Sequence, residues 1–425
     1  MRDTGAIRGG ERPERLLLVS TNYAPEQTGI GPYATDIAEH LVAGRRAEVH
    51  VLAGMPHYPA WRLDPAYRGV RRTVDERAGV LIHRRAHSVP VRQTAARRAL
   101  YEASILAHGL MAPPRMGPPD AVLAQVPSLA GGLLAARLAR RHRAPFLPVV
   151  QDLMGAAAAQ SGISGGGRAA GAAAAVERRM LREATLVGII HETFRDRVRA
   201  LGVPEDRIRL VPNWTHIAEP GGTPAATRAR LGWKPGETVL LHSGNMGLKQ
   251  GLEVLVETAR RAPHLRVVLM GEGSRRGRLE ELGAGLPNLD FLPPAAAEDF
   301  PAVLAAADAL LVTQRAGVLD MSVPSKLTSY FAAGRPVIAS VADGSGTAEE
   351  IRRADAGWVV APENPDAVIA AARELAADPE AAGAVGARGA DYARTRLGRD
   401  TGLGRVCALL DEALERHRAP KENAR

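Results

Sequence analysis

The sequence contains one cysteine, Cys407, among its 425 residues. A single thiol forms no internal disulfide and cannot supply the thiolates of a cysteine-based zinc site. Aromatic residues make up only 4% of the chain, and no nucleic-acid recognition motif accompanies them, so we expect no nucleic-acid partner. The composition excludes a disulfide scaffold and fits a reducing cytoplasm.

Long apolar runs are also missing. Two stretches without Lys or Arg stand out, 99–114 and 121–136, and both fall short of the roughly 20 residues that a membrane-spanning helix needs. The first apolar run, 16–19, is much shorter than the apolar region of a signal peptide. We therefore expect a cytoplasmic protein with neither a spanning helix nor a secretion signal.

Positive charge is in excess, with 55 Lys and Arg against 46 Asp and Glu and a formal net charge of +9. This balance favours polyanionic partners such as phosphorylated substrates or anionic lipid, and a solvated basic surface explains it equally well. The chain is 46% hydrophobic and 24% charged, as in packed globular proteins. Its length predicts two large domains.

Short apolar runs alternate with alanine-rich stretches of helical spacing, which predicts parallel, doubly wound sheets. The predicted strands of the first half are 16–21, 48–53, 80–84, 121–126, 146–151 and 186–190. The alternation stops near residues 213–214, and the stretch rich in Gly and Pro at 219–224 is the predicted linker. It then restarts with strands at 239–243, 267–270, 290–292, 309–313, 336–340 and 358–360, followed by amphipathic helices over 366–417.

The predicted domains are 1–215 and 216–398, with a C-terminal helix and tail at 399–425 that packs back toward the first domain. A segment rich in Gly and Ala at 155–171 precedes a predicted helix. Two interpretations of this segment stay open, a mobile lid and a plain surface connection.

Glycine-rich turns join a strand to a helix in both halves. The first, at 22–32, contains Gly29 and Gly31 and is a candidate binding loop or only a tight turn. Because Tyr33 and Ala34 follow, the spacing is not the dinucleotide motif G-x-G-x-x-G, which disfavours a nicotinamide cofactor.

The second turn, at 244–253, places Lys249 where its ammonium can reach a diphosphate. It lacks the terminal G-K-[ST] of an ATP-binding loop. A third motif, Pro324-Ser325-Lys326, puts a hydroxyl and an ammonium in the first turn of a helix that Gly334 ends. These two turns predict a phosphate site in the second domain.

The ordered set of motifs resembles the retaining GT-B glycosyltransferases of family 4, most of all the bacterial subgroup that builds colanic acid and other exopolysaccharide or O-antigen units. The resemblance extends over about 16–414. The segments that carry it are 22–33, 55–59, 211–214, 244–253 and 324–340.

The resemblance implies an α/β protein with the GT-B fold, in which two Rossmann-like domains face a central cleft. The first domain would bind the acceptor and the second the nucleotide sugar. The implied acceptor-binding residues are Gly29, Gly31, Tyr33 and His57. The implied donor-binding residues are Gly244, Asn245, Lys249, Ser325 and Lys326, with Glu349 near the ribose.

The candidate catalytic residues are Asp152, Lys249 and Lys326. Asp152 follows a predicted strand, where open α/β sheets place ligand contacts, and it would orient the acceptor or stabilise the departing sugar. Capping of a helix is the alternative role for this carboxylate. The lysines would stabilise charge on the leaving diphosphate. His191, also at a strand end, ranks lower because such a histidine is more often structural.

One departure from the family concerns the donor sugar. Many relatives carry two glutamates with seven residues between them, and here those positions hold Met321 and Ser329, with Asp320 only a neighbour. Donor identity is therefore open. A GT-B-shaped sugar-nucleotide epimerase and a non-catalytic nucleotide-sugar-binding protein are the alternative functions.

We expect no metal and no cofactor, since the sequence has no Asp-x-Asp pair and the nucleotide sugar is a substrate. The implied acceptor is a saccharide, free or linked to polyprenyl diphosphate. Segment 89–119 carries four arginines (Arg92, Arg97, Arg98, Arg115) around apolar residues. It would dock on anionic lipid at the inner face of the plasma membrane, or pack on the core with its arginines solvated.

Overall fold

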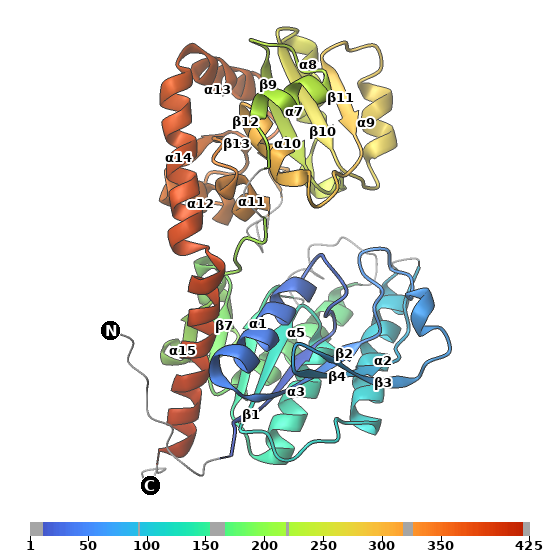
Figure 1. Ribbon diagram of the computed structural model, residues 1–425. Coiled ribbons are helices and arrows are strands. Elements are labelled where there is room, and N and C mark those ends of the chain that lie inside the picture. The colour runs from blue at the N-terminus through green and yellow to red at the C-terminus, as the bar shows by residue number, and fades with distance from the viewer. Residues whose placement is uncertain (1–11, 92–93, 154–165, 218–220, 318–325, 420–425) are drawn as a thin grey trace. The chain divides into compact units, whose positions relative to one another are not determined.

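The computed structural model describes residues 12–91, 94–153, 166–217, 221–317 and 326–419. The chain packs into two units, of which one is Met1–Pro212 with Leu403–Arg425 and the other is Asn213–Gly402. Each unit is a sheet of mainly parallel strands with helices on its faces (Figure 1). Leu403–Arg425, the last part of the chain, packs with the first part.

The first unit is built on an eight-stranded sheet of order β3-β4-β2-β1-β5-β6-β7-β8. Only β3, at one edge, runs antiparallel to its neighbour. Because helices cover both faces, the inner strands are apolar without alternation, and all residues of β5 are buried. The strands are β1 (Arg15–Ser20), β2 (Glu48–Gly54), β3 (Arg72–Arg77), β4 (Val80–Arg85), β5 (Ala121–Val126), β6 (Phe146–Val150), β7 (Val187–Ile189) and β8 (Ile208–Leu210).

From β1 the chain first forms β2 on one side and later returns to form β5 on the other side of β1. Right-handed crossovers therefore put α1 on one face and α2 and α3 on the other. Ser128 caps α3 by accepting from the Gly131 amide. The helices are α1 (Gly31–Arg45), α2 (Ala95–Met111), α3 (Leu129–His142), α5 (Gly166–Arg182), α6 (Arg195–Ala200) and α15 (Arg399–Arg418).

The second unit has a fully parallel six-stranded sheet of order β11-β10-β9-β12-β13-β14. The strands are β9 (Thr238–Ser243), β10 (Leu265–Met270), β11 (Leu289–Leu292), β12 (Ala309–Thr313), β13 (Val337–Ser340) and β14 (Gly357–Val360). Two buried apolar clusters lie on its two faces. The helices are α7 (Pro224–Leu231), α8 (Glu253–Arg261), α9 (Arg276–Leu282), α10 (Phe300–Ala306), α11 (Lys326–Ala332), α12 (Gly346–Ala354), α13 (Pro365–Ala377) and α14 (Pro379–Arg396).

The predicted doubly wound α/β architecture is confirmed, and each predicted strand range overlaps a strand. Two strands were not predicted, β3 and β8. β3 reads Arg-Thr-Val-Asp-Glu-Arg, has no buried residue and pairs on one side only, so it lacks an apolar run. Within the described ranges, no helix combines the length and apolar content needed to cross a bilayer.

Candidate functional site

Most predicted donor residues lie at one edge of the second sheet. Carboxyl ends of parallel strands meet at a single edge, where open α/β sheets bind ligands. Gly244 directly follows β9, Lys326 opens the helix that follows β12, and Glu349 lies in the first turn after β13. Ser325, like Met321, lies outside the described residues.

Lys326 is a charged group that lies next to the glycine loop at this edge. Its side chain is half-buried, and a Cβ placed on Gly244 would lie 3.5 Å from the Lys326 Nζ. Burial lowers the pKa of this ammonium to about 8. Within the described chain no carboxylate forms an ion pair with it. The ammonium thus faces the glycine loop with no counter-ion among the described residues.

The loop after β9 needs glycine because two backbone segments meet there. Gly244 has φ +123° and Gly271, after β10, has φ +143°. A Cβ on Gly271 would overlap the Gly244 carbonyl oxygen. The Gly244 amide donates to Met270 O at 2.9 Å. The loop is thereby fixed against β10 with its own backbone exposed, as an approaching anion requires.

The other predicted donor residues are exposed. Asn245 adjoins Gly244, and Lys249 lies in the short helix η4 (Leu248–Gln250) of the same loop. The Lys249 carbonyl accepts from the Arg315 amide at 3.0 Å, which fixes the backbone while the ammonium stays in solvent. Glu349 is exposed on α12. These groups are reachable by a ligand but are less constrained than Lys326.

Sequence reasoning missed His242, the residue before the last one of β9. Its ring is fully buried, with Nδ1 3.3 Å from Leu311 O. Burial, and next the charge of Lys326, hold the pKa of His242 well below its usual value. The ring is therefore neutral beside Lys326. Its only sequence signal is its position just before the glycine loop.

In the first unit, a carboxylate that sequence reasoning also missed organises the predicted acceptor loops. Glu26 is 7% exposed and lies in the loop between β1 and α1. It accepts from the His57 amide at 2.7 Å, the Tyr58 amide at 2.8 Å and Asn22 Nδ2 at 2.9 Å. Glu26 thus ties the loop after β1 to the loop after β2.

The two predicted acceptor glycines are packed against these loops. Gly29 has φ +68°, and a Cβ there would lie 3.0 Å from the Tyr58 ring. A Cβ on Gly31 would lie 2.7 Å from Glu26 O. Contacts within the chain therefore account for both glycines. Tyr33 is buried in α1, and burial raises the pKa of its hydroxyl to about 12.

His57 lies in a cluster of rings contributed by three segments. Its Nδ1 is 2.9 Å from Met55 O, and its Nε2 has no partner among the described residues. Burial lowers the pKa of His57, so the ring is neutral. The His87 ring lies 4.6 Å away between centroids, and Arg98 of α2 stacks on Trp61 at 4.6 Å. The cluster presents aromatic surface and a histidine nitrogen together.

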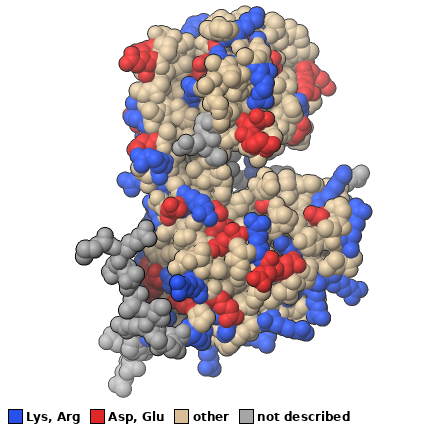
Figure 2. All heavy atoms as spheres, in the orientation of Figure 1, with Lys and Arg blue, Asp and Glu red and all other residues tan. Residues whose placement is uncertain are grey.

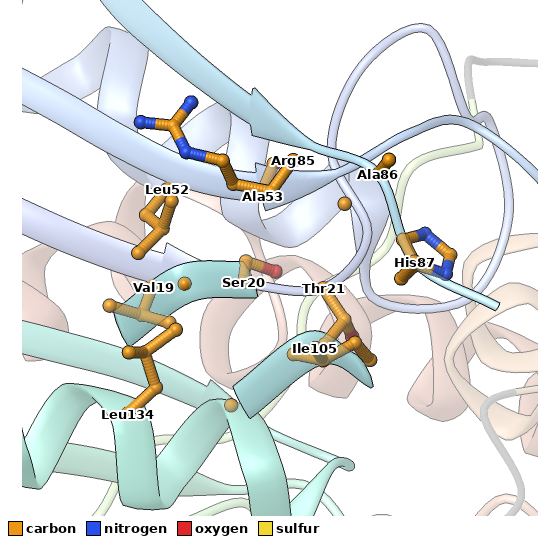
Figure 3. Close-up of a pocket in the computed structure, with 13 residues that line it drawn as sticks. Val19, Ser20, Thr21, Leu52, Ala53, Arg85, Ala86, His87, Ile105 and Leu134 are labelled. Carbon is orange, nitrogen blue, oxygen red and sulfur yellow. The ribbon is translucent and has the colours of Figure 1, made fainter. Parts of the chain in front are cut away.

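A small pocket, open to solvent, adjoins this cluster (Figure 3). It lies between the ends of β1, β2 and β4 and the helices α2 and α3. Val19, Leu52 and Leu134 lie together on one side in Figure 3, with His87 on the other. The lining is mainly apolar, so the pocket itself offers few groups that bind sugar hydroxyls.

Asp152 follows β6, at the same edge of the first sheet as these loops. Its carboxylate accepts from the Leu153 amide at 2.8 Å. The segment 154–165 lies outside the described residues, including most of the predicted lid. His191 accepts from the Thr193 amide at 3.2 Å and caps the short helix η2 (Glu192–Phe194). In this position His191 acts as a helix cap.

Sequence comparison covers both units. Residues 28–214 match a family described as "Glycosyl transferase 4-like domain", and residues 237–378 match "Glycosyl transferases group 1". The chain is 31% identical over 336 residues to a protein of Escherichia coli (strain K12) named as the colanic acid biosynthesis glycosyl transferase WcaI. The match spans 75% of this chain and 81% of that protein.

The chain belongs to the family 4 glycosyltransferases.

Solved structures show that this family 4 glycosyltransferase has the GT-B fold. Anabaena Alr3699/HepE in complex with UDP superposes with a TM-score of 0.68 at 16% identity, over 94% of this chain and 100% of that one. WaaG, a glycosyltransferase involved in lipopolysaccharide biosynthesis, gives 0.61 at 18% identity, over 96% and 100%. The family and the fold implied by the motifs are thus confirmed, and the enzyme is a retaining glycosyltransferase.

Proposed function

We propose that the enzyme moves a sugar from a nucleoside diphosphate to a saccharide linked to polyprenyl diphosphate, during synthesis of exopolysaccharide or O-antigen. The observation that carries the donor assignment is Lys326, a half-buried ammonium without a described counter-ion beside the exposed backbone of Gly244. The diphosphate of the donor would supply the missing negative charge. HepE, which shares the fold, is known in complexes with UDP and UDP-glucose, so UDP is the first nucleotide to test.

In this proposal the second domain holds the donor. Lys326 and Lys249 contact the diphosphate together with Ser325 and the amides of Gly244 and Asn245, while Glu349 binds the ribose. The first domain positions the acceptor with His57 and the loop of Gly29, Gly31 and Tyr33. Glu26 supports this assignment by fixing both loops.

Transfer with retention proceeds by attack of the acceptor hydroxyl on the face that the diphosphate leaves. The bond between the anomeric carbon and the diphosphate oxygen breaks, the acceptor oxygen takes its place, and the hydroxyl proton passes to the leaving phosphate. Lys326 and Lys249 stabilise the charge that develops on the diphosphate. Asp152 orients the acceptor or stabilises the positive charge of the departing sugar.

We propose that the lysines meet the charge of the diphosphate without a divalent metal. Among the described residues, no group of three His, Cys, Asp or Glu side chains is arranged to hold an ion. Transfer activity should persist in EDTA and fall at least a hundredfold in Lys326→Ala, in line with loss of one stabilising group in a preorganised site. Strict dependence on an added divalent ion would contradict this part of the proposal.

The donor assignment is tested by thermal-shift and calorimetric titration with UDP, GDP, TDP and their sugars. One diphosphate and its sugar should stabilise the wild type, and Lys326→Met should abolish the effect. The exposed Lys234 of the same unit provides a matched control, Lys234→Met, which should bind as the wild type does. Absence of any response to all the nucleotides would contradict the donor assignment.

We place the enzyme at the inner face of the plasma membrane, where a lipid-linked acceptor would be found. The exposed face of α2 supports this proposal, because it bears apolar residues and one arginine and no carboxylate. Its members are Ala96, Arg97, Ala99, Leu100, Ala103, Ala107, Leu110 and Met111. Leu100 is 57% exposed and Met111 71%. Such a face combines apolar contact with attraction to anionic lipid.

A further inference from the structure

Three arginines of the first unit converge near the C-terminal end of α2. Arg72 on β3 and Arg85 on β4 are direct cross-strand partners, so their side chains leave the same face of the sheet. Arg115 follows α2. Burial, and next the charges of Arg72 and Arg115, lower the pKa of the Arg85 guanidinium. Like charges in this arrangement repel one another and cost stability.

Arg85 is the arginine of this cluster whose side chain is fixed by the protein, because it is only 8% exposed and is hydrogen-bonded to backbone carbonyls. Its guanidinium donates to Ala112 O at 2.6 Å, Arg84 O at 2.8 Å and Pro113 O at 3.4 Å. Two of these carbonyls follow the end of α2, where the helix dipole amounts to about half a negative charge. This offsets only part of one guanidinium.

No carboxylate of the described residues forms an ion pair with Arg72, Arg85 or Arg115. Elsewhere in this unit arginines are commonly paired, as Arg45 is with Glu14 and Arg84 with Asp75. The described residues therefore leave most of the charge of the three-arginine cluster uncompensated. A guanidinium group donates pairs of parallel hydrogen bonds, and an oxygen group with one or two negative charges is the ligand that accepts them best.

Exposed apolar side chains flank the cluster. Val74, two residues beyond Arg72 on the same face of β3, is 61% exposed, and Met111, next to Ala112, is 71% exposed. Figure 2 shows Lys and Arg atoms gathered along the side of the first unit where Figure 1 places β3 and α2. Guanidinium groups next to exposed apolar side chains match the boundary between phosphate and acyl chain in an anionic bilayer.

We propose that Arg72, Arg85 and Arg115 bind the phosphate of an anionic phospholipid headgroup, with Val74 and Met111 entering the adjoining acyl region. This inference rests on the proposed action at a membrane surface, and adds the site that would hold the lipid. Arg85 gives the site a fixed donor, whereas Arg72 and Arg115 are exposed and adapt to the headgroup.

The test is co-sedimentation of the full-length enzyme, without nucleotide, with vesicles of phosphatidylcholine alone or mixed with phosphatidylglycerol. The wild type should bind only the mixed vesicles. Because each basic residue near an anionic surface contributes about fivefold, Arg72→Gln/Arg115→Gln should lower the partition coefficient about thirtyfold. The control pair Arg137→Gln/Arg141→Gln removes the same charge from exposed positions of α3 and should stay within about threefold of the wild type.

Each other outcome overturns a defined statement. Equal losses in both pairs would show attraction by net charge and overturn the site. Failure of the wild type to bind mixed vesicles would overturn the site and the membrane location together, while UDP titration of the same protein tests the donor assignment separately. Inorganic phosphate at constant ionic strength should not stabilise the wild type against heat. If phosphate stabilised the wild type but not the Arg72→Gln/Arg115→Gln variant, the site would bind soluble phosphate and the assignment to a lipid headgroup would be wrong.

Discussion

Replacing Lys326 with methionine should stabilise the ligand-free enzyme while it removes nucleotide binding. Burial moves the pKa of Lys326 from 10.5 to about 8. At about 1.36 kcal/mol per pKa unit, the folded protein loses roughly 3 kcal/mol at neutral pH by keeping this ammonium charged. Methionine has a similar length and no charge, so Lys326→Met should recover most of that free energy. For a domain of this size the melting temperature should rise by roughly 5–10 °C.

The pH dependence of the free energy of unfolding provides a second test of the charge on Lys326. Between pH 8 and 10.5 the folded protein binds fewer protons at Lys326 than the unfolded chain does, so the free energy of unfolding of the wild type rises with pH in this window. Below pH 8 both states carry the proton, and the full cost is present. The Lys326→Met variant should lack this rise.

Differential scanning calorimetry with and without UDP, from pH 7 to pH 10, measures both effects. The wild type should gain stability from UDP at pH 7 and progressively less above pH 8, as the ammonium loses its proton. Lys326→Arg should keep its response to UDP at high pH, because a guanidinium stays charged. Destabilisation of the ligand-free protein by Lys326→Met, or unchanged UDP binding by it, would refute the reasoning.

Three further predictions concern other parts of the two units. Burial lowers the pKa of His83 to about 4, so as the pH falls the unfolded chain binds a proton at His83 before the folded protein does, and about 3 kcal/mol of stability should be lost between pH 6.5 and pH 4. Urea unfolding at both pH values should show a smaller loss in His83→Gln, and an equal loss would contradict the assignment. Glu26→Ala leaves two loop amides without their acceptor and should lower the free energy of unfolding, measured in urea, by about 3 kcal/mol, with a smaller decrease in Glu26→Gln. Equal stability of all three proteins would show that the loops do not depend on this carboxylate. Gly271→Ala places a Cβ against the Gly244 carbonyl and should weaken UDP binding, measured by calorimetry, at least tenfold. The control Gly277→Ala, which has open space around it, should bind UDP as the wild type does. Unchanged affinity in Gly271→Ala would mean that the loop can shift without loss of UDP binding.

The glycine and lysine motifs could be identified from sequence because each is local. Gly244 directly follows a predicted strand and Lys326 lies two residues after Pro324, so both positions are recognised from neighbouring residues alone. Their environment is not local. The lowered pKa of Lys326 depends on burial against a loop far away in the sequence, and no spacing rule predicts that loss of hydration.

The sequence by itself determined the two α/β sheets, the positions of most strands and the family, because apolar runs and glycine turns are written in consecutive residues. Only the tertiary structure decided that Glu26 joins two loops and that Arg72 and Arg85 lie side by side next to Arg115. Strand pairing and helix docking bring these residues together across long stretches of chain. Hydrogen bonds, desolvation and repulsion depend on distance in space, and the order of residues does not contain that distance.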